Sequence, residues 1–245
     1  MNENILEVRG LRKKYGNFEA VKGIDFDIRK GEVFALIGPN GAGKTTTLRM
    51  IATLLSITDG DAVINGISVK TGSSKVRELI TYLPDEAGAY KNMKGIDYLK
   101  FMASLYANNS ENAKKMVETA KEICGLGDRL TEKVSAYSKG MTRKLLLSRA
   151  VMTIPALSVL DEPTSGLDII NGLEIRNLIK KLSKEKNMSF LISGHNMLEI
   201  EYISDHVAVI DKGVIYAYGT PESLKKEYEA NNLEEVFVKA VKSHE

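Results

Sequence analysis

Cysteine is almost absent from this chain. Its 245 residues include one cysteine, Cys124, and no tryptophan. Because a disulfide needs two thiols, an internal disulfide and a cysteine-rich metal site are both excluded. Cys124 lies in a run with helical periodicity, where a cysteine is typically a small buried hydrophobic residue. So little cysteine is typical of proteins that work in a reducing cytosol.

Long hydrophobic runs are also missing. No apolar stretch approaches the ~20 residues that cross a bilayer, and the first residues, MNENILEVRG, have no apolar core of a secretion signal. We therefore expect a chain that neither spans a membrane nor is exported by that route. Asn108-Asn109-Ser110 matches a glycosylation acceptor, but in a cytosolic chain this match is a chance one.

An excess of charge of one sign is the third absence. Thirty-four basic and 32 acidic residues leave a net charge of +2. Binding to DNA or RNA through phosphate neutralisation needs a surplus of positive charge, so no nucleic-acid partner is expected. The chain is 43% hydrophobic and 27% charged, which is ordinary for a globular domain and argues against long disorder.

The first third of the chain has the patterns of short strands. Expected strands lie at residues 5–10, 24–28 and 33–38. The last of these, VFALIG, is continuously apolar, which indicates a strand buried on both faces. A helix is expected at 46–55, and a hairpin turning at Asn65-Gly66 follows.

The hydrophobic pattern changes between about Pro84 and Pro155, where apolar residues recur with helical periodicity. We expect helices at 97–107, 113–126 and 141–152, and then strands at 156–162 and 189–195 with a helix at 171–186 between them. Alternating strands and helices predict parallel pairing with right-handed crossovers.

One face of a helix is also predicted near the end of the chain. It carries Leu233, Val236, Phe237, Ala240 and Val241. We favour a helix packed on its own domain, and a helix facing a partner is the alternative.

A phosphate-binding loop is the most specific motif. Gly38-Pro39-Asn40-Gly41-Ala42-Gly43-Lys44-Thr45 matches G-x-x-x-x-G-K-[ST] in full, between an expected strand and an expected helix. Glycines let backbone N–H groups converge on an anion, and the helix N-terminus adds positive potential. Lys44 is expected to reach the β- and γ-phosphates, and the Thr45 hydroxyl can bind Mg²⁺.

Two carboxylates follow a buried strand. In LSVLDE, Asp161 and Glu162 come at the carboxyl end, where ligands bind in parallel sheets. Asp161 is a candidate for the Mg²⁺ shell and Glu162 for the general base that activates water. Taken alone, two acids after a strand could simply be solvated, and the complete phosphate loop favours the catalytic interpretation.

Histidine is scarce, with three residues. His195 follows the strand at 189–194 and could contact the γ-phosphate and orient water. His206 and His244 have no such placement and are interpreted as structural.

Together these motifs resemble the nucleotide-binding subunits of ATP-binding cassette (ABC) transporters, over nearly the whole chain. The resemblance identifies GPNGAGKTT, which includes Thr46, as Walker A, LSVLDEP as Walker B, and His195 as the switch histidine. It implies that Tyr15 stacks on adenine, whereas from the sequence alone Tyr15 could equally be a surface aromatic. Ser165-Gly166-Leu167-Asp168 matches the D-loop.

The segment YSKGM occupies the place of the family's signature motif. Ser138 and Gly140 stand as the family has them, while Lys139 and Met141 replace its glycine and glutamine. Locally, Ser138 can cap a helix. The resemblance implies that the segment meets the γ-phosphate bound by another protomer, and it makes YSKGM our main indication of a dimer. YSKGM and the tail from Gly219 are similar to the drug- and antibiotic-exporter branch.

One position departs from the family. After the strand ITYLP the family usually carries a glutamine that touches Mg²⁺ and the attacking water, and this chain has Asp85, followed by Glu86. A carboxylate can still reach the metal shell. We therefore expect Asp85 to be a catalytic and Mg²⁺-binding residue in a differently tuned coupling loop.

The resemblance also implies the fold and its divisions. We expect an α/β protein with a P-loop NTPase core, that is, a parallel or mixed sheet with flanking helices, an N-terminal antiparallel β subdomain and an inserted α-helical subdomain. Residues 1–245 would form a single ABC ATPase domain. The ATP-binding core would comprise 1–84 and 156–220, the helical subdomain 85–155, and a helical tail 221–245.

The function implied is an ATPase, with ATP and Mg²⁺ as cofactors, that powers export through a separate integral membrane permease. The chain would pair with a second nucleotide-binding subunit, identical or different, around two ATP molecules. It would be cytoplasmic and peripheral on the inner face of the membrane. The alternatives are a non-transport ABC ATPase of a soluble assembly and a regulatory module that holds ATP without hydrolysing it.

Overall fold

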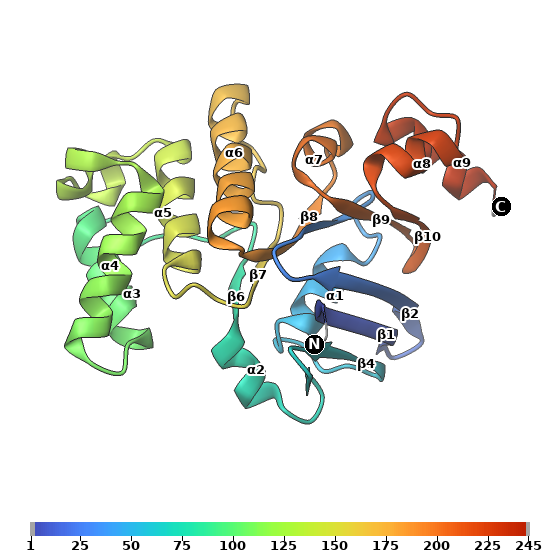
Figure 1. The fold of residues 1–245 in the computed structure, drawn as a ribbon, viewed down its shortest axis with the longest axis horizontal. Coiled ribbons are helices and arrows are strands. Elements are labelled where there is room, and N and C mark those ends of the chain that lie inside the picture. Colours follow the sequence, from blue (N-terminus) through green and yellow to red (C-terminus); the bar gives the residue numbers. More distant parts are fainter. Residues whose placement is uncertain (1–2, 244–245) are drawn as a thin grey trace.

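Two sheets organise the protein, and the computed structural model describes residues 3–243. The central sheet has six strands in the order β10-β9-β3-β8-β7-β6 (Figure 1). Five of its strands are parallel, and β10 is antiparallel to β9. The strands are β3 (Val33–Ile37), β6 (Ile80–Leu83), β7 (Leu157–Leu160), β8 (Ser189–Gly194), β9 (His206–Asp211) and β10 (Val214–Gly219).

The second sheet is antiparallel, in the order β2-β1-β4-β5. It contains β1 (Asn4–Tyr15), β2 (Phe18–Arg29), β4 (Asp59–Ile64) and β5 (Ile67–Ser68). The hairpin predicted at Asn65-Gly66 is confirmed, since Ile64 pairs with Ile67 across it. Both turn residues have positive φ, 48° and 81°, as a two-residue hairpin turn of this kind requires. The first two strands extend well beyond the short segments predicted, because β1 and β2 pair along almost their full length.

Nine α-helices lie within residues 3–243. They are α1 (Lys44–Ile51), α2 (Ser73–Leu79), α3 (Gly95–Tyr106), α4 (Ser110–Cys124), α5 (Lys139–Val151), α6 (Ile169–Lys186), α7 (Met197–Ile203), α8 (Pro221–Glu227) and α9 (Leu233–Lys242). Polar caps start several of them earlier than periodicity predicts. Asn109, from the glycosylation-like triplet, accepts a hydrogen bond from the Asn112 N–H at 2.8 Å and so begins α4.

The core is split by the central sheet into two clusters. Val33, Ala35 and Ile37 of β3 face one cluster, and Phe34 and Leu36 face the other. This explains the continuous apolar run of β3, since both of its faces are buried.

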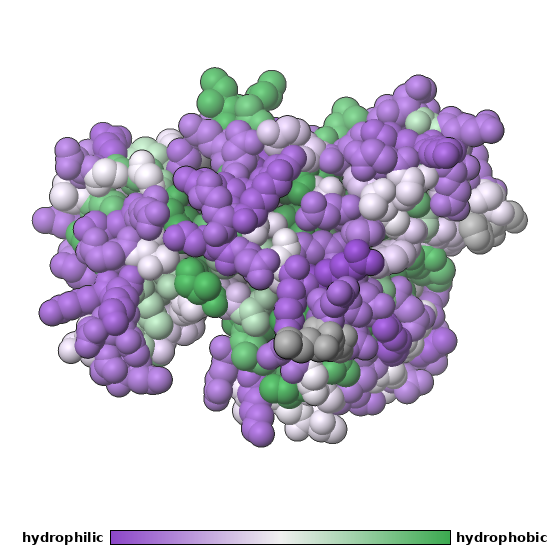
Figure 2. Space-filling model, viewed as in Figure 1, coloured by the Kyte–Doolittle hydropathy of each residue, from purple (hydrophilic) through white to green (hydrophobic). Residues whose placement is uncertain are grey.

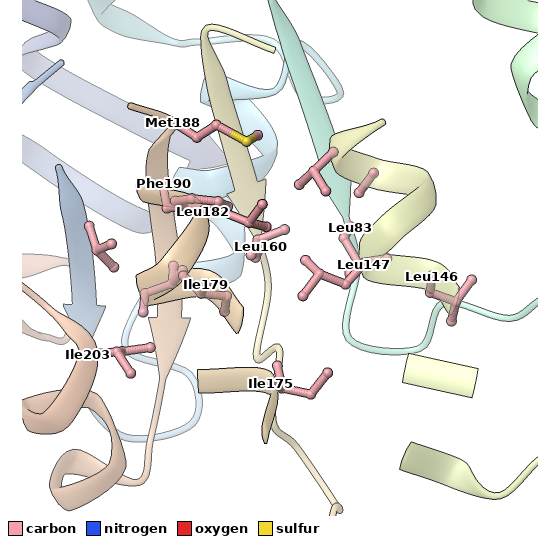
Figure 3. Close-up of a cluster of buried hydrophobic side chains, with 14 of the residues drawn as sticks. Leu83, Leu146, Leu147, Leu160, Ile175, Ile179, Leu182, Met188, Phe190 and Ile203 are labelled. Atoms are coloured by element: carbon pink, nitrogen blue, oxygen red, sulfur yellow. The ribbon is translucent and has the colours of Figure 1, made fainter. Parts of the chain in front are cut away.

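Helices α3, α4 and α5 lie together at one end of the molecule, next to α6, and α8 and α9 lie at the other (Figure 1). The helical end shares its core with the sheet. Leu146 and Leu147 of α5 belong to the same buried cluster as Leu83 of β6 and Leu160 of β7 (Figure 3). The second half of α5 is therefore packed in the same core as the carboxyl ends of β6 and β7.

Helix α9 packs on its own chain, as predicted. Leu233, Val236 and Ala240 are fully buried in the cluster that also contains residues of α7 and β9, and Phe237 packs against it partly buried. Cys124 is buried as expected. Across residues 3–243, the search for a helix long and apolar enough to cross a membrane finds none.

Candidate nucleotide site

The loop from Gly38 to Thr45 joins β3 to α1 and is pressed against neighbouring backbone. A Cβ at Gly38 would lie 2.0 Å from the carbonyl oxygen of Ile210, and one at Gly43 would lie 2.8 Å from that of Ala20. Gly43 also has a φ of 107°, which side-chain-bearing residues rarely adopt. These positions therefore require glycine, so that the loop can curl ahead of the helix N-terminus.

Lys44 occupies the inside of this loop. Its Nζ donates to the carbonyls of Gly38 at 2.7 Å and Pro39 at 3.0 Å, and lies 3.9 Å from Glu162 Oε1. The side chain is buried, and burial lowers the pKa of Lys44 while Glu162 and Asp161 oppose that shift. An anion entering the loop would stabilise the charged form of this lysine.

Asp161 joins three hydroxyl groups. Thr45 Oγ1 and Ser193 Oγ donate to its Oδ1 at 3.1 and 2.6 Å, and Tyr82 OH donates to its Oδ2 at 3.2 Å. The hydroxyl and carboxylate predicted to share Mg²⁺ are thus adjacent, and oxygen donors of this kind would suit that ion. Ser193 and Tyr82 were not predicted, because only the folded sheet brings their strands together. Within residues 3–243 there is no group of three or more His, Cys, Asp or Glu residues placed to hold a metal.

Glu162 and His195 form a second pair beside the loop. His195 Nδ1 contacts Glu162 Oε2, and the Glu162 N–H donates to Ser193 Oγ at 2.9 Å. Glu162 has a φ of 48°, an uncommon conformation for a residue with a side chain. Such conformations are concentrated at functional sites. The residue predicted to activate the attacking water, Glu162, and the residue predicted to orient it, His195, are therefore in contact.

A cavity of about 300 Å³ lies over the loop. It is lined by Tyr15, Phe18, Ala20, Asn40, Gly41, Gly43, Lys44, Thr45, Thr46 and Glu162. Tyr15 and Phe18 pair at the turn between β1 and β2 and are 47% and 65% exposed. Tyr15 is therefore placed where it could contact an adenine ring bound above the phosphate loop. Phe18 was not predicted, although a second aromatic residue three positions after Tyr15 was a usable signal.

Comparison with known proteins decides the family. The family profile described as ABC transporter matches residues 21–165. The chain belongs to the ABC transporter family. It is 34% identical over 220 residues to the linearmycin resistance ATP-binding protein LnrL of Bacillus subtilis (strain 168), covering 90% of this chain and 70% of that protein. It is also 34% identical over 222 residues to the bacitracin transport ATP-binding protein BcrA of Bacillus licheniformis, covering 91% and 72%.

Solved structures agree in fold. An ATP-binding subunit of an ABC transporter superposes with a TM-score of 0.84 at 27% identity, covering 97% of this chain and 99% of that one. A second structure, cbiO1 of Clostridium perfringens, part of the complex cbiONQ, gives 0.84 at 26% identity, covering 93% of each chain. The resemblance to exporter-type ATP-binding subunits and the predicted fold class are thus confirmed.

The segment predicted to be the signature begins α5. Ser138 Oγ accepts a hydrogen bond from the Met141 N–H at 3.1 Å, so Ser138 is the helix cap that the sequence predicts. A Cβ at Gly140 would lie 1.9 Å from Asn171 Oδ1 on α6. The motif therefore packs against the start of α6. None of residues 138–141 lines the cavity over the phosphate loop of its own chain.

The predicted D-loop, Ser165 to Asp168, lies between the carboxylates that follow β7 and the start of α6. Asp168 caps α6 by accepting from the Asn171 N–H at 3.0 Å and from its Nδ2 at 2.6 Å, and these hydrogen bonds lower the pKa of Asp168. Ser165, Gly166 and Leu167 line a cavity of about 210 Å³ together with Glu162 and His195. The loop thus passes directly beside the predicted catalytic pair.

Asp85 contacts a residue that the sequence did not indicate. It was predicted to join Thr45 and Asp161 at the metal, but its Oδ1 lies 3.6 Å from Arg143 Nη2 on α5. Arg143 Nη2 also donates to the Asp85 carbonyl at 3.0 Å. A buried arginine thus faces the carboxylate that was predicted to bind Mg²⁺, and the metal role of Asp85 stays a prediction.

Of the other two histidines, the structure describes one. His206 Nδ1 pairs with Glu32, and its ring stacks near Tyr218. His244 lies outside the described residues.

Proposed function

We propose that this ABC ATP-binding subunit hydrolyses ATP to drive export through a separate membrane permease. The proposal rests above all on the Glu162–His195 pair beside Lys44 and the phosphate loop. Lys44 would neutralise the β- and γ-phosphates, and Tyr15 would stack on adenine, with Phe18 beside it in the same cavity. The loop residues from Gly38 to Thr46 would bind the phosphates.

Glu162 would accept the proton of the attacking water. Its carboxylate already contacts His195, which would hold it in place and contact the γ-phosphate. Thr45 and Asp161 would hold Mg²⁺, which would supply charge neutralisation at the phosphates. Each of these residues lies at the carboxyl edge of the central sheet, as ligand-binding residues do in such folds.

A second cassette would complete each site. Ser138 to Met141 form a helix N-terminus suited to an anion, yet they do not line the cavity of their own chain. The first residues of α6, directly after the D-loop, also suggest a surface that becomes covered. Ile169 and Ile170 are 84% and 72% exposed, and hydrophobic side chains gather over one end of α6 (Figure 2). We infer pairing with another copy or with a different cassette around two ATP molecules.

The relatives' printed names, linearmycin resistance and bacitracin transport, support a transport role. We propose export of a drug- or antibiotic-like substrate and a position on the cytoplasmic face of the membrane. The helical subdomain at 85–155 would dock on the permease, with 1–84 and 156–220 as ATP-binding core and 221–245 as tail.

The test is the Glu162→Gln variant. It should bind ATP as tightly as the unaltered chain but lower kcat about a hundredfold or more, because the base is lost. Glu185→Gln, which alters an exposed acid of α6, is the matched control and should leave kcat unchanged. Equal turnover by Glu162→Gln and the unaltered chain would refute the catalytic assignment. Copurification of the tagged chain from host membranes with a multi-spanning protein tests the transport role, and recovery in a soluble assembly would favour the non-transport alternative.

A further inference from the structure

Asp85 and Arg143 join two parts of the site that are far apart in the sequence. Asp85 lies in the loop that leaves β6, two residues after Leu83. Arg143 lies on α5, five residues after the cap Ser138 and on the helix that carries the signature. The backbone carbonyl and the carboxylate of Asp85 both face the same guanidinium nitrogen, Nη2, at 3.0 and 3.6 Å.

Arg143 depends on this contact because it is buried. It is 6% exposed, and in the part of the chain that the structure describes its Nη1 has no hydrogen-bond partner. Burial lowers the pKa of Arg143, and Asp85 opposes that shift. A buried cation is costly unless a counter-charge stays with it. A move of the Asp85 carboxylate to a metal ion would leave this guanidinium uncompensated.

The pair also lies where the signature and the D-loop meet. Asp85, Lys139, Arg143 and Ser165 line one cleft of about 470 Å³. A Cβ at Gly166 of the D-loop would lie 2.0 Å from Lys139 Nζ, so the start of α5 closely approaches this loop. A shift of α5 relative to the Asp85 loop would therefore change the orientation of the signature toward a second cassette.

We propose that Asp85 is a positioning residue, not a Mg²⁺ ligand: its carboxylate neutralises Arg143 and holds the signature end of α5 in the orientation offered to a second cassette. The proposal rests on the function proposed above, since it concerns the site that two cassettes share. It explains why a carboxylate can stand where the family usually has a neutral amide, because the charge has a buried partner within the same chain.

The experiment compares Asp85→Asn, Arg143→Met, the double variant and Asp85→Glu with the unaltered chain. Four quantities are measured: the thermal midpoint without nucleotide, ATP affinity at low protein concentration, kcat, and the Mg²⁺ concentration that gives half-maximal rate. Glu86→Gln is the matched control, because Glu86 is an exposed acid lining the same cleft, and it should change none of the four.

Asp85→Asn should lower the thermal midpoint and reduce kcat about tenfold, a usual size for coupling between sites, while ATP affinity and the Mg²⁺ requirement stay within twofold. The double variant should recover part of both losses, since it removes the orphaned cation together with its partner. Asp85→Glu should keep most of kcat, because a carboxylate remains to pair with Arg143.

Two results would overturn the proposal. A metal ligand at position 85 would raise the Mg²⁺ requirement of Asp85→Asn about tenfold or more. Additive effects of Asp85→Asn and Arg143→Met on the thermal midpoint would show that the two residues do not act as a pair. Failure of the proposed function is recognised separately, because then the unaltered chain itself would not hydrolyse ATP. The thermal midpoints of the single and double variants without nucleotide would still show whether Asp85 and Arg143 act as a pair.

Discussion

Gly140, in the proposed signature, is a position where packing within the chain leaves no room for a side chain. Its missing side chain leaves room for Asn171 Oδ1, only 1.9 Å from where a Cβ would lie. Asn171 cannot easily move, because it is hydrogen-bonded to Asp168 through both its N–H and its Nδ2. The glycine therefore serves the packing of α5 on α6 as well as any contact with ATP.

Gly140→Ala should consequently destabilise the chain and slow it. Forcing a methyl group into this contact should lower the free energy of unfolding by about 1–3 kcal/mol, and the displaced helix start should lower the ATPase rate. Urea unfolding and a steady-state phosphate assay measure the two effects. Gly88→Ala is the control for stability, because no atom beyond the adjacent residues lies within 4 Å of its Cβ position. Equal unfolding free energies for the two variants would contradict the packing argument.

The residues of the phosphate loop could be predicted from the sequence, whereas the side chains that contact them from other strands and helices could not. The loop from Gly38 to Thr45 could be read from contiguous sequence, because its chemistry depends on local backbone. Ser193 and Tyr82 reach Asp161 only through strand order in the central sheet. Asp85 was assigned to the metal from the family's usual glutamine at that position, and nothing near it in sequence indicates Arg143.

At the scale of elements, helix caps decide where the functional segments begin. Periodicity placed the start of α5 at Met141 and that of α6 at Asn171, and both helices begin two residues earlier, just after the caps Ser138 and Asp168. Helices α2 and α7 and strands β9 and β10 were not predicted. The two helices have seven residues each, too few for a clear period.

Comparing the helix caps Ser138 and Asn109 separates an effect on stability from an effect on catalysis. Ser138→Ala and Asn109→Ala each remove an oxygen that accepts a first-turn N–H, at 3.1 and 2.8 Å. Each should lower the free energy of unfolding by about 0.5–2 kcal/mol. Only Ser138→Ala should also lower kcat strongly, because α4 carries no part of the proposed site. Urea unfolding and ATPase assays at a temperature where both variants stay folded provide the comparison, and a similar kcat for the two would count against a role for Ser138 in catalysis.

At the scale of the whole molecule, the two halves of the proposed site line separate clefts of one chain. The cavity over the phosphate loop is lined from β1, β2 and the loop itself. The signature and the D-loop border a different cleft, with Asp85 and Arg143. The resemblance implied that the two halves serve different protomers, and in the structure they line different clefts.

Mixing two inactive variants tests whether the halves work in different copies. Lys44→Ala should lose the phosphate loop and Ser138→Ala the signature, so each alone should be nearly inactive. In a mixed pair, the intact loop of one copy meets the intact signature of the other, and an equal mixture should recover about a quarter of the unaltered rate, since half of the pairs are mixed and each has one complete site. The recovered rate should rise with total protein concentration, because pairing is required. Sites completed within one chain would give no recovery at any concentration, and Lys44→Ala mixed with a Lys44→Ala/Ser138→Ala double variant is the control that should remain inactive.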